Sequence, residues 1–187
     1  MNFLNDAELA ILDGIQRVMG NGFFDTFFSL ITKLGDGGVF FIAIGLMLLI
    51  FNKTRKCGIM ILAALILELV VVNLTMKPLF ARVRPYDVNA AYQLLINAPH
   101  DYSFPSGHTA SAFAFAAAIF AFNKKWGIAA GILALLIGFS RLYLYIHYPT
   151  DVAAGLVIGI ALGLLGALLT NTVYRTLEKR KKQKEAV

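Results

Sequence analysis

Long apolar stretches, separated by short polar or basic segments, make up most of the chain. A membrane-spanning helix needs about 20 mainly apolar residues. The stretches that come near this length are residues 38–51, 57–76, 105–122, 127–146 and 151–173. Each is predicted to be an α-helix, because lipid offers no hydrogen-bond partners to an open backbone. The pattern therefore predicts an all-α fold, a polytopic transmembrane helix bundle that forms a single domain over residues 1–187.

The opening segment, residues 1–34, is less uniformly apolar. Residues 5–19 have the mixed polar and apolar character of an amphipathic helix, and residues 21–34 are rich in phenylalanine but short for a span. We predict one or two interfacial helices here, with a short additional span as the alternative. The bundle is thus expected to contain five or six membrane helices.

The composition narrows the class of protein. Hydrophobic residues make up 58% of the chain and charged residues 15%, whereas soluble domains have about 45–50% and about 25%. An ordinary water-soluble enzyme or a disordered chain is therefore not expected. Nor is a nucleic-acid partner, since no aromatic residues interleave with the basic tail. The lone cysteine, Cys57, cannot form an internal disulfide.

Positive charges are concentrated in residues 52–56, residues 123–126 and the tail, residues 175–187. If the predicted spans alternate in direction, all three segments fall on one side of the membrane, which the positive-inside rule identifies as cytoplasmic. The tail is then a basic cytoplasmic segment, either a solvated helix end or a contact with anionic lipids. Residues 77–104 and 145–150 lie on the opposite, extracytoplasmic side.

Three polar clusters lie at helix ends on that extracytoplasmic side. They are Lys77-Pro-Leu-Phe-Ala-Arg-Val-Arg84-Pro85, Pro105-Ser106-Gly107-His108, and Ser140-Arg141 followed by His147 and Asp151. Lys77, Arg84 and Arg141 are cations near lipid, where a charge is costly unless it faces a polar cavity or a partner. Arginine and lysine both bind phosphate oxygens. Backbone N–H groups at a helix start, here Ser106 and Gly107, also attract anions, so the clusters predict a phosphate site.

Two histidines give this site groups for chemistry. A neutral imidazole can attack phosphorus, and a protonated one can donate its proton to the leaving oxygen. His147 and Asp151 are four residues apart, so the carboxylate can hold the proton of one imidazole nitrogen and leave the other nitrogen free to attack. His108 lies at the predicted phosphate site and would be the acid. The surrounding cations would repel a divalent metal ion, so a metal ion is not expected at this site, and we predict no other cofactor.

Together, these motifs resemble the three-part signature of the type-2 phosphatidic acid phosphatase superfamily, which includes membrane lipid phosphatases, soluble acid phosphatases and vanadium haloperoxidases. Every signature position from Lys77 to Asp151 matches, and the joint pattern is far more specific than any single cluster. The resemblance implies a metal-independent reaction in which His147 is the nucleophile and forms a phosphohistidine. It also implies that Asp151 orients His147 and that His108 is the general acid. The phosphate ligands implied in the same way are Lys77, Arg84, Ser106, Gly107 and Arg141.

The resemblance further implies an integral membrane lipid phosphatase at the extracytoplasmic face of the bacterial inner membrane. Its partners would be the bilayer and a lipid that carries a phosphomonoester or a pyrophosphate, and we favour undecaprenyl pyrophosphate or phosphatidylglycerophosphate. A lipid phosphotransferase that uses the same intermediate is an alternative. A non-catalytic anion or lipid transporter is another, although transport of an anion requires neither a nucleophile nor an acid.

Four polar residues near these motifs are expected to have lesser roles. Glu68, inside the second apolar stretch, is predicted to be a hydrogen-bonded structural acid, with Asn73 as a candidate neighbour. Arg82 misses the signature spacing and is expected to be an interfacial charge. Asp101 is expected to lie in a solvated loop before the second cluster, with a place in the lining of the site's entry as the alternative.

Overall fold

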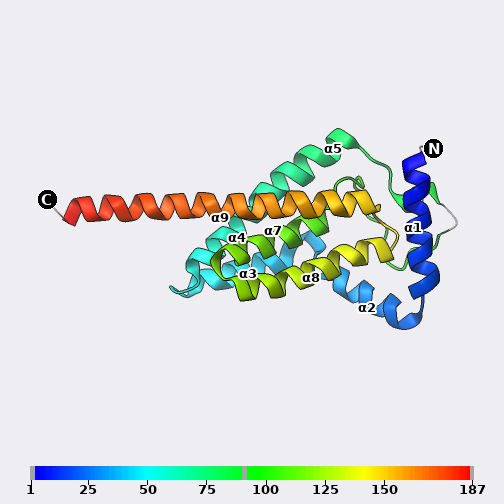
Figure 1. Cartoon of the computed structure of the whole chain (residues 1–187), viewed down its shortest axis with the longest axis horizontal. Coiled ribbons are helices and arrows are strands. Elements are labelled where there is room, and N and C mark those ends of the chain that lie inside the picture. The colour runs from blue at the N-terminus through cyan, green and yellow to red at the C-terminus, as the bar shows by residue number, and fades with distance from the viewer. Residues whose placement is uncertain (1–2, 90–91, 186–187) are drawn as a thin grey trace.

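Most of the long helices run side by side in the computed structural model of the chain, which describes residues 3–89 and 92–185 (Figure 1). No strand occurs in these residues, and the predicted all-α class is confirmed. The α-helices are α1 Phe3–Met19, α2 Gly22–Lys33, α3 Val39–Ile50, α4 Arg55–Glu68, α5 Lys77–Phe80, α6 Pro85–Val88, α7 Gly107–Phe122, α8 Lys124–Tyr143 and α9 Pro149–Glu185. A short 3₁₀ turn, η1 Asp36–Gly38, precedes α3, and a π-helical segment, η2 Leu69–Met76, joins α4 to α5.

Within the described residues, up to four segments are long and apolar enough to cross a membrane. Three are single segments: Arg55–Val88, Lys124–Tyr143 and Pro149–Lys184. The fourth is a bent pair of α2 and the segment Asp36–Ile50, whose axes meet at 41°. Residues 21–34, for which we predicted an interfacial helix or a separate short span, thus continue into α3 and can form one bent span with it. α7 is also apolar but shorter, with 16 residues.

The helix α7 packs against α4, α8 and α9 in the interior of the bundle. It is buried almost without interruption from Gly107 to Ala118, and it has no polar face because other helices surround it. Small residues bring the backbones together. At Gly159 of α9, an added Cβ would lie only 2.4 Å from the carbonyl oxygen of Ala110 on α7. Close helix packing of the kind common in membrane bundles follows from these contacts.

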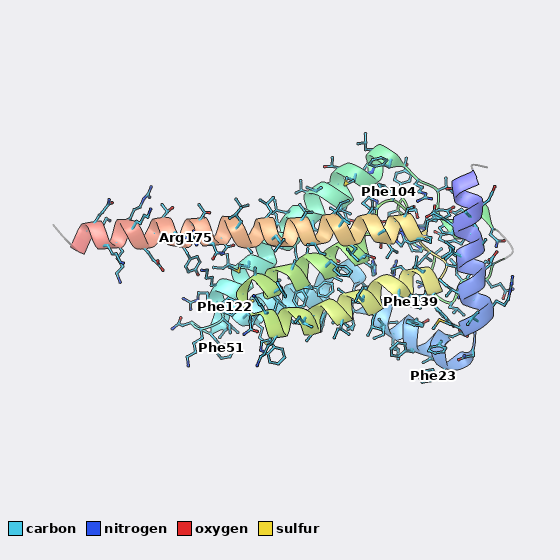
Figure 2. All side chains as sticks on the ribbon, viewed as in Figure 1. Phe23, Phe51, Phe104, Phe122, Phe139 and Arg175 are labelled. Carbon is cyan, nitrogen blue, oxygen red and sulfur yellow. The ribbon has the colours of Figure 1, made fainter. Side chains whose placement is uncertain are left out.

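The two ends of the bundle differ. At one end lie the turn at residues 51–54, Asn123 between α7 and α8, and the basic end of α9 (Figure 1). The basic segments share this end as predicted, although Lys124 and Lys125 belong to the first turn of α8 rather than to a loop. Beyond Arg175, α9 continues past the bundle as the same helix (Figure 2). At the other end, α1 lies across the ends of the long helices (Figure 1).

Close packing between α7 and α9 makes the effect of an added methyl group depend strongly on position. Gly159→Ala places a Cβ against the Ala110 backbone, and overpacking of this kind costs about 1–3 kcal/mol. Gly131→Ala in α8 adds a Cβ with no neighbour within 4 Å and gains about 1 kcal/mol of helix propensity. We expect the first variant to lower the thermal unfolding midpoint in detergent and the second to keep or raise it. Equal shifts of the unfolding midpoint in the two variants would contradict the close contact between α7 and α9.

Candidate active site

A cavity of about 320 Å³ lies at the same end of the bundle as α1. Residues from all three clusters line it: Lys77, Arg84, His108, Arg141 and His147. They come from α5, the residue before α6, the first turn of α7, the last turn of α8 and the turn before α9. The remaining lining residues are Thr32, Lys33, Asp36, Ile96, Asn97, Pro99 and Asp101. The structure therefore brings the three clusters together around one cavity.

Arg84 and Arg141 are buried beside this cavity, each 2% exposed. Arg84 donates through Nη1 to the backbone oxygen of Ile146 at 2.7 Å and through Nε to that of Asp101 at 2.8 Å. Arg141 donates through Nη1 to Thr32 Oγ1, while its Nε atom has no hydrogen-bond partner in the described part of the chain. Neutral groups therefore bind both guanidinium groups.

An acidic residue, Asp101, lies between two of the cations. Its carboxylate forms ion pairs with Lys77 Nζ and with Arg84 Nη2, the latter at 2.5 Å. Burial raises the pKa of Asp101, but the hydrogen bond from Lys77 and the charges of Lys77 and Arg84 outweigh this effect and lower the pKa to about 2. Asp101 lies in a loop and is half-exposed, as predicted, and it also lines the cavity and contacts two of the predicted phosphate ligands.

The two ring nitrogens of His147 face different partners. Nε2 lies 3.2 Å from Arg84 Nη1, and Nδ1 lies 3.4 Å from Asp151 Oδ2. Arginine can only donate and an ionised carboxylate can only accept, so Nδ1 carries the proton and the lone pair of Nε2 faces Arg84. Burial and the neighbouring positive charges, Arg84 foremost, hold the pKa of His147 well below its usual range. The imidazole is thus neutral, with its basic nitrogen on the side of Arg84 and the cavity.

His108 faces a carboxylate that the sequence pattern did not indicate. Its Nε2 atom lies 2.8 Å from Asp36 Oδ1, and both residues line the cavity. Asp36 belongs to the break between α2 and α3, where Gly37 adopts a left-handed φ of 57°. An acid within a glycine-rich break between apolar segments is the signal that would have found it. A carboxylate at this distance accepts a hydrogen bond from an Nε2 proton, so Asp36 holds the His108 ring by this nitrogen.

Ser106 and Gly107 lie at the start of α7, beside the cavity rather than in its lining. Ser106 is the N-cap residue, and its Oγ accepts a hydrogen bond from the Thr109 backbone N–H at 3.4 Å. This cap explains why α7 begins at Gly107 and not at the predicted residue 105. A Cβ at Gly107 would lie 2.9 Å from Asn73 Oδ1 and 3.5 Å from Lys77 Nζ. Glycine is therefore needed where α7 approaches these side chains.

Asp151 has partners that the sequence pattern also missed. Its Oδ1 accepts a hydrogen bond from Arg82 Nη1 at 2.6 Å, and its Oδ2 accepts one from Ser103 Oγ at 2.5 Å. Arg82 forms a second ion pair with Glu8 of α1. The prediction of an interfacial charge at Arg82 is wrong, because its guanidinium binds two buried carboxylates. No spacing rule relates Glu8 to Asp151, so the sequence held no signal for this contact.

A second cavity, of about 470 Å³, adjoins the first, and Lys77, Asp101 and His108 line both. Its other walls are mainly apolar side chains and glycines from α3, α4 and the break before α3. Glu68 is buried in this wall and accepts a hydrogen bond from Asn73 at 3.0 Å, which confirms that these two residues are neighbours. An apolar chamber therefore opens beside the charged one.

The chain is similar to curated proteins over most of its length. Residues 56–175 match the model of the PAP2 superfamily. An undecaprenyl-diphosphatase from Sulfolobus acidocaldarius is 36% identical over 128 residues, which cover 67% of this chain and 61% of that protein. The chain spans about three fifths of the length of the first curated relatives that it matches.

Two solved structures have a similar fold. The crystal structure of Aquifex aeolicus LpxE has a TM-score of 0.75 and 32% sequence identity, and the match covers 86% of this chain and 94% of that one. The first transmembrane PAP2 type phosphatidylglycerolphosphate phosphatase from Bacillus subtilis has the same TM-score of 0.75 and 25% identity, with 92% and 89% covered. The similarity to a transmembrane protein agrees with the apolar spans, and the chain is a membrane protein.

Because Asp101 pairs with two cavity cations, it competes with any anion that binds there. Asp101→Asn removes this competitor, while Arg84 keeps its backbone acceptors. We expect the variant to bind orthovanadate, a tetrahedral phosphate mimic, on the order of 10-fold more tightly, which corresponds to about 1.4 kcal/mol. Titration calorimetry of the protein in detergent measures this change. Asp87→Asn, which removes the same charge at an exposed position outside the cavity, is the control. Unchanged or weaker binding by Asp101→Asn would rule out a shared site.

Proposed function

Because the chain belongs to the PAP2 superfamily, we propose that it is an integral membrane lipid phosphatase that acts through a phosphohistidine intermediate. The observation that carries the proposal is a single cavity lined by three buried cations and two histidines. Lys77, Arg84 and Arg141 supply the positive charge that a phosphate group needs, and Ser106 and Gly107 place the start of α7 beside it. In this mechanism the protein's own cations stabilise the negative charge of the phosphate group, as a metal ion would in a metal-dependent enzyme.

Hydrolysis takes two steps in this proposal. His147 Nε2 attacks phosphorus, the bond between phosphorus and the leaving oxygen breaks, and His108 gives that oxygen its proton. Asp151 holds the Nδ1 proton of His147 and stabilises the positive charge that the imidazole gains. Water then attacks the phosphohistidine while His108 accepts the water proton, which yields phosphate and free imidazole. The buried cations stabilise the charge on the phosphoryl oxygens in both steps.

The two adjoining cavities support a substrate with a charged head and an apolar tail. The larger cavity shares Lys77 and His108 with the smaller one, and side chains such as Ile42 and Ile66 make it suitable for the first part of a lipid chain. Undecaprenyl pyrophosphate and phosphatidylglycerophosphate are the substrates that we favour. Their support is the names of similar proteins, an undecaprenyl-diphosphatase and a phosphatidylglycerolphosphate phosphatase.

The proposed location is the inner membrane of a bacterium, with the cavity at the extracytoplasmic face and the C-terminus in the cytoplasm. Its support is the charge distribution, since the basic start of α8 and the basic end of α9 lie at the end of the bundle opposite the cavity. The positive-inside rule assigns that end to the cytoplasm. A transporter would share the cations but would have no use for the contact between Asp151 and His147.

Phosphate release from lipid substrates tests the proposal. We expect the protein, purified in detergent with EDTA, to release phosphate from short-chain isoprenoid pyrophosphate or phosphatidylglycerophosphate, and the substrate class is the one with the higher kcat/KM. His147→Ala should lower kcat by at least about 10³-fold, because loss of a catalytic nucleophile has effects of this order. His100→Ala, at an exposed position outside the smaller cavity, is the control and should keep full activity. Unchanged release by His147→Ala would defeat the proposed nucleophile, and transfer to an added alcohol in place of water would indicate a phosphotransferase.

The surroundings of His147 also predict the pH dependence. Attack requires the neutral imidazole, and burial beside Arg84 holds the pKa of His147 well below the ordinary value of about 6.5. A lowered pKa means that the ring gains a proton only at lower pH. We therefore expect kcat/KM, corrected for ionisation of the substrate phosphate, to stay constant as the pH falls through about 6.5 and to decline only at pH values well below it. An acid limb centred at the ordinary value would be inconsistent with the buried, cation-flanked imidazole.

A further inference from the structure

A chain of alternating charges connects α1 to His147. Glu8 Oε2 pairs with Arg82 Nη2 at 2.5 Å, and Arg82 Nη1 pairs with Asp151 Oδ1 at 2.6 Å. Asp151 Oδ2 in turn lies 3.4 Å from His147 Nδ1. Glu8, Asp151 and His147 are buried, and only 19% of the Arg82 side chain is exposed. The N-terminal helix is therefore linked, through buried ionic contacts, to the proposed nucleophile.

Arg82 is held from several directions. Its Nη1 also donates to Thr150 Oγ1 at 2.7 Å, and its Nη2 donates to Asn5 Oδ1 at 3.0 Å. Its guanidinium carbon lies 3.9 Å from the centre of the Tyr148 ring. A planar group with several fixed N–H donors can satisfy these partners together, and a lysine cannot. Arg82 therefore fixes the direction of the Asp151 carboxylate in addition to balancing its charge.

Glu8 is buried against the start of α9, the helix that carries Asp151. Its Oε1 accepts hydrogen bonds from the backbone N–H and the hydroxyl of Thr150, at 2.8 Å and 2.7 Å. Thr150 lies in the first turn of α9, where backbone N–H groups have no partner within the helix. A buried carboxylate is costly unless it is paired and hydrogen-bonded, and Glu8 is both. It thus caps α9 and binds the arginine that contacts Asp151.

We propose that Glu8 and Arg82 are positioning residues that keep the Asp151 carboxylate aligned and effective beside His147. Arg82 by itself would cancel the charge of Asp151. With Glu8 present, the three side chains keep one net negative charge, which remains available to hold the Nδ1 proton of His147. The inference rests on the proposed function, because the pair supports the same nucleophile. It extends that function to α1, which lies outside the family match at residues 56–175.

Because neither residue lines the cavity with His147, their loss should affect turnover more than substrate binding. We expect Glu8→Gln and Arg82→Gln each to lower kcat by about 10- to 100-fold, the effect of a displaced catalytic group. KM should change by less than about 2-fold, as for an interaction that acts on the chemical step. Arg82→Lys keeps the charge but loses the planar fork, and its kcat should lie between those of Arg82→Gln and the unchanged protein.

Asp13→Asn is the matched control, because Asp13 also ties α1 to the turn before α9. It accepts a hydrogen bond from the Tyr145 hydroxyl at 2.8 Å and, within the described residues, forms no hydrogen bond or ion pair with Asp151. We expect this variant to keep the kcat of the unchanged protein. If Asp13→Asn and Glu8→Gln lost the same activity, a general loosening of α1 would explain both, and the inference would be overturned.

An Asp151→Asn background separates positioning from folding. If Glu8 acts through Asp151, then Glu8→Gln should lower kcat by no more than about 2-fold in that background, since the group that it positions is already lost. A further 10-fold loss there, or full kcat in folded Glu8→Gln protein, would overturn the inference. Thermal midpoints and orthovanadate affinity establish that each variant is folded. Should Glu8→Gln not fold, Arg82→Lys takes its place in the same comparison.

The outcomes for the inference and for the proposed function are distinct. Phosphate release that persists in His147→Ala would defeat the proposed function itself. An inactive His147→Ala protein together with a fully active, folded Glu8→Gln protein would overturn only the positioning role.

Discussion

Buried positive charge is the constraint on which the arrangement of this end of the bundle depends. Guanidinium and ammonium groups taken out of water lose several kcal/mol each in hydration unless partners compensate. The chain supplies those partners from segments that are far apart in sequence. The acids are Glu8 from α1, Asp101 from the loop before α7 and Asp151 from α9. The course of the segments between the spans is thus determined largely by the cations that they must satisfy.

The helix α7 holds the residues at its N-terminal end in a fixed position. Its alanine-rich middle lets α4, α8 and α9 approach closely, so its N-terminal end can shift little relative to its neighbours. Ser106, Gly107 and His108 stand at that end, and the backbone N–H of Ser106 donates to the backbone oxygen of Asp151 at 3.1 Å. The second and third clusters are therefore joined through the backbone as well as through side chains.

The sequence was informative where the relevant property is local. Hydropathy reports contact with lipid, so it located the apolar helices, although α7 is shorter than the candidate spans. Motif spacing identified part of the lining of the smaller cavity, namely Lys77, Arg84, His108, Arg141 and His147. Sequence patterns did not predict the contacts between side chains that only tertiary packing brings together. Asp101 and Arg82 look like loop and interface residues, because nothing in the local pattern shows that a carboxylate will meet Lys77 or that a guanidinium will meet Asp151. The 41° bend between α2 and α3 was missed for a related reason, since hydropathy does not measure direction.

The Asp101 carboxylate gives the smaller cavity a built-in exchangeable anion. Under the proposed function, a departing phosphate does not leave Lys77 and Arg84 bare in a poorly solvated chamber, because a side chain attached to the adjacent loop takes over their charge. Product departure and substrate arrival then become swaps of one anion for another at nearly constant local charge. The affinity of such a site for an incoming anion is always measured against the tethered carboxylate that the anion must displace.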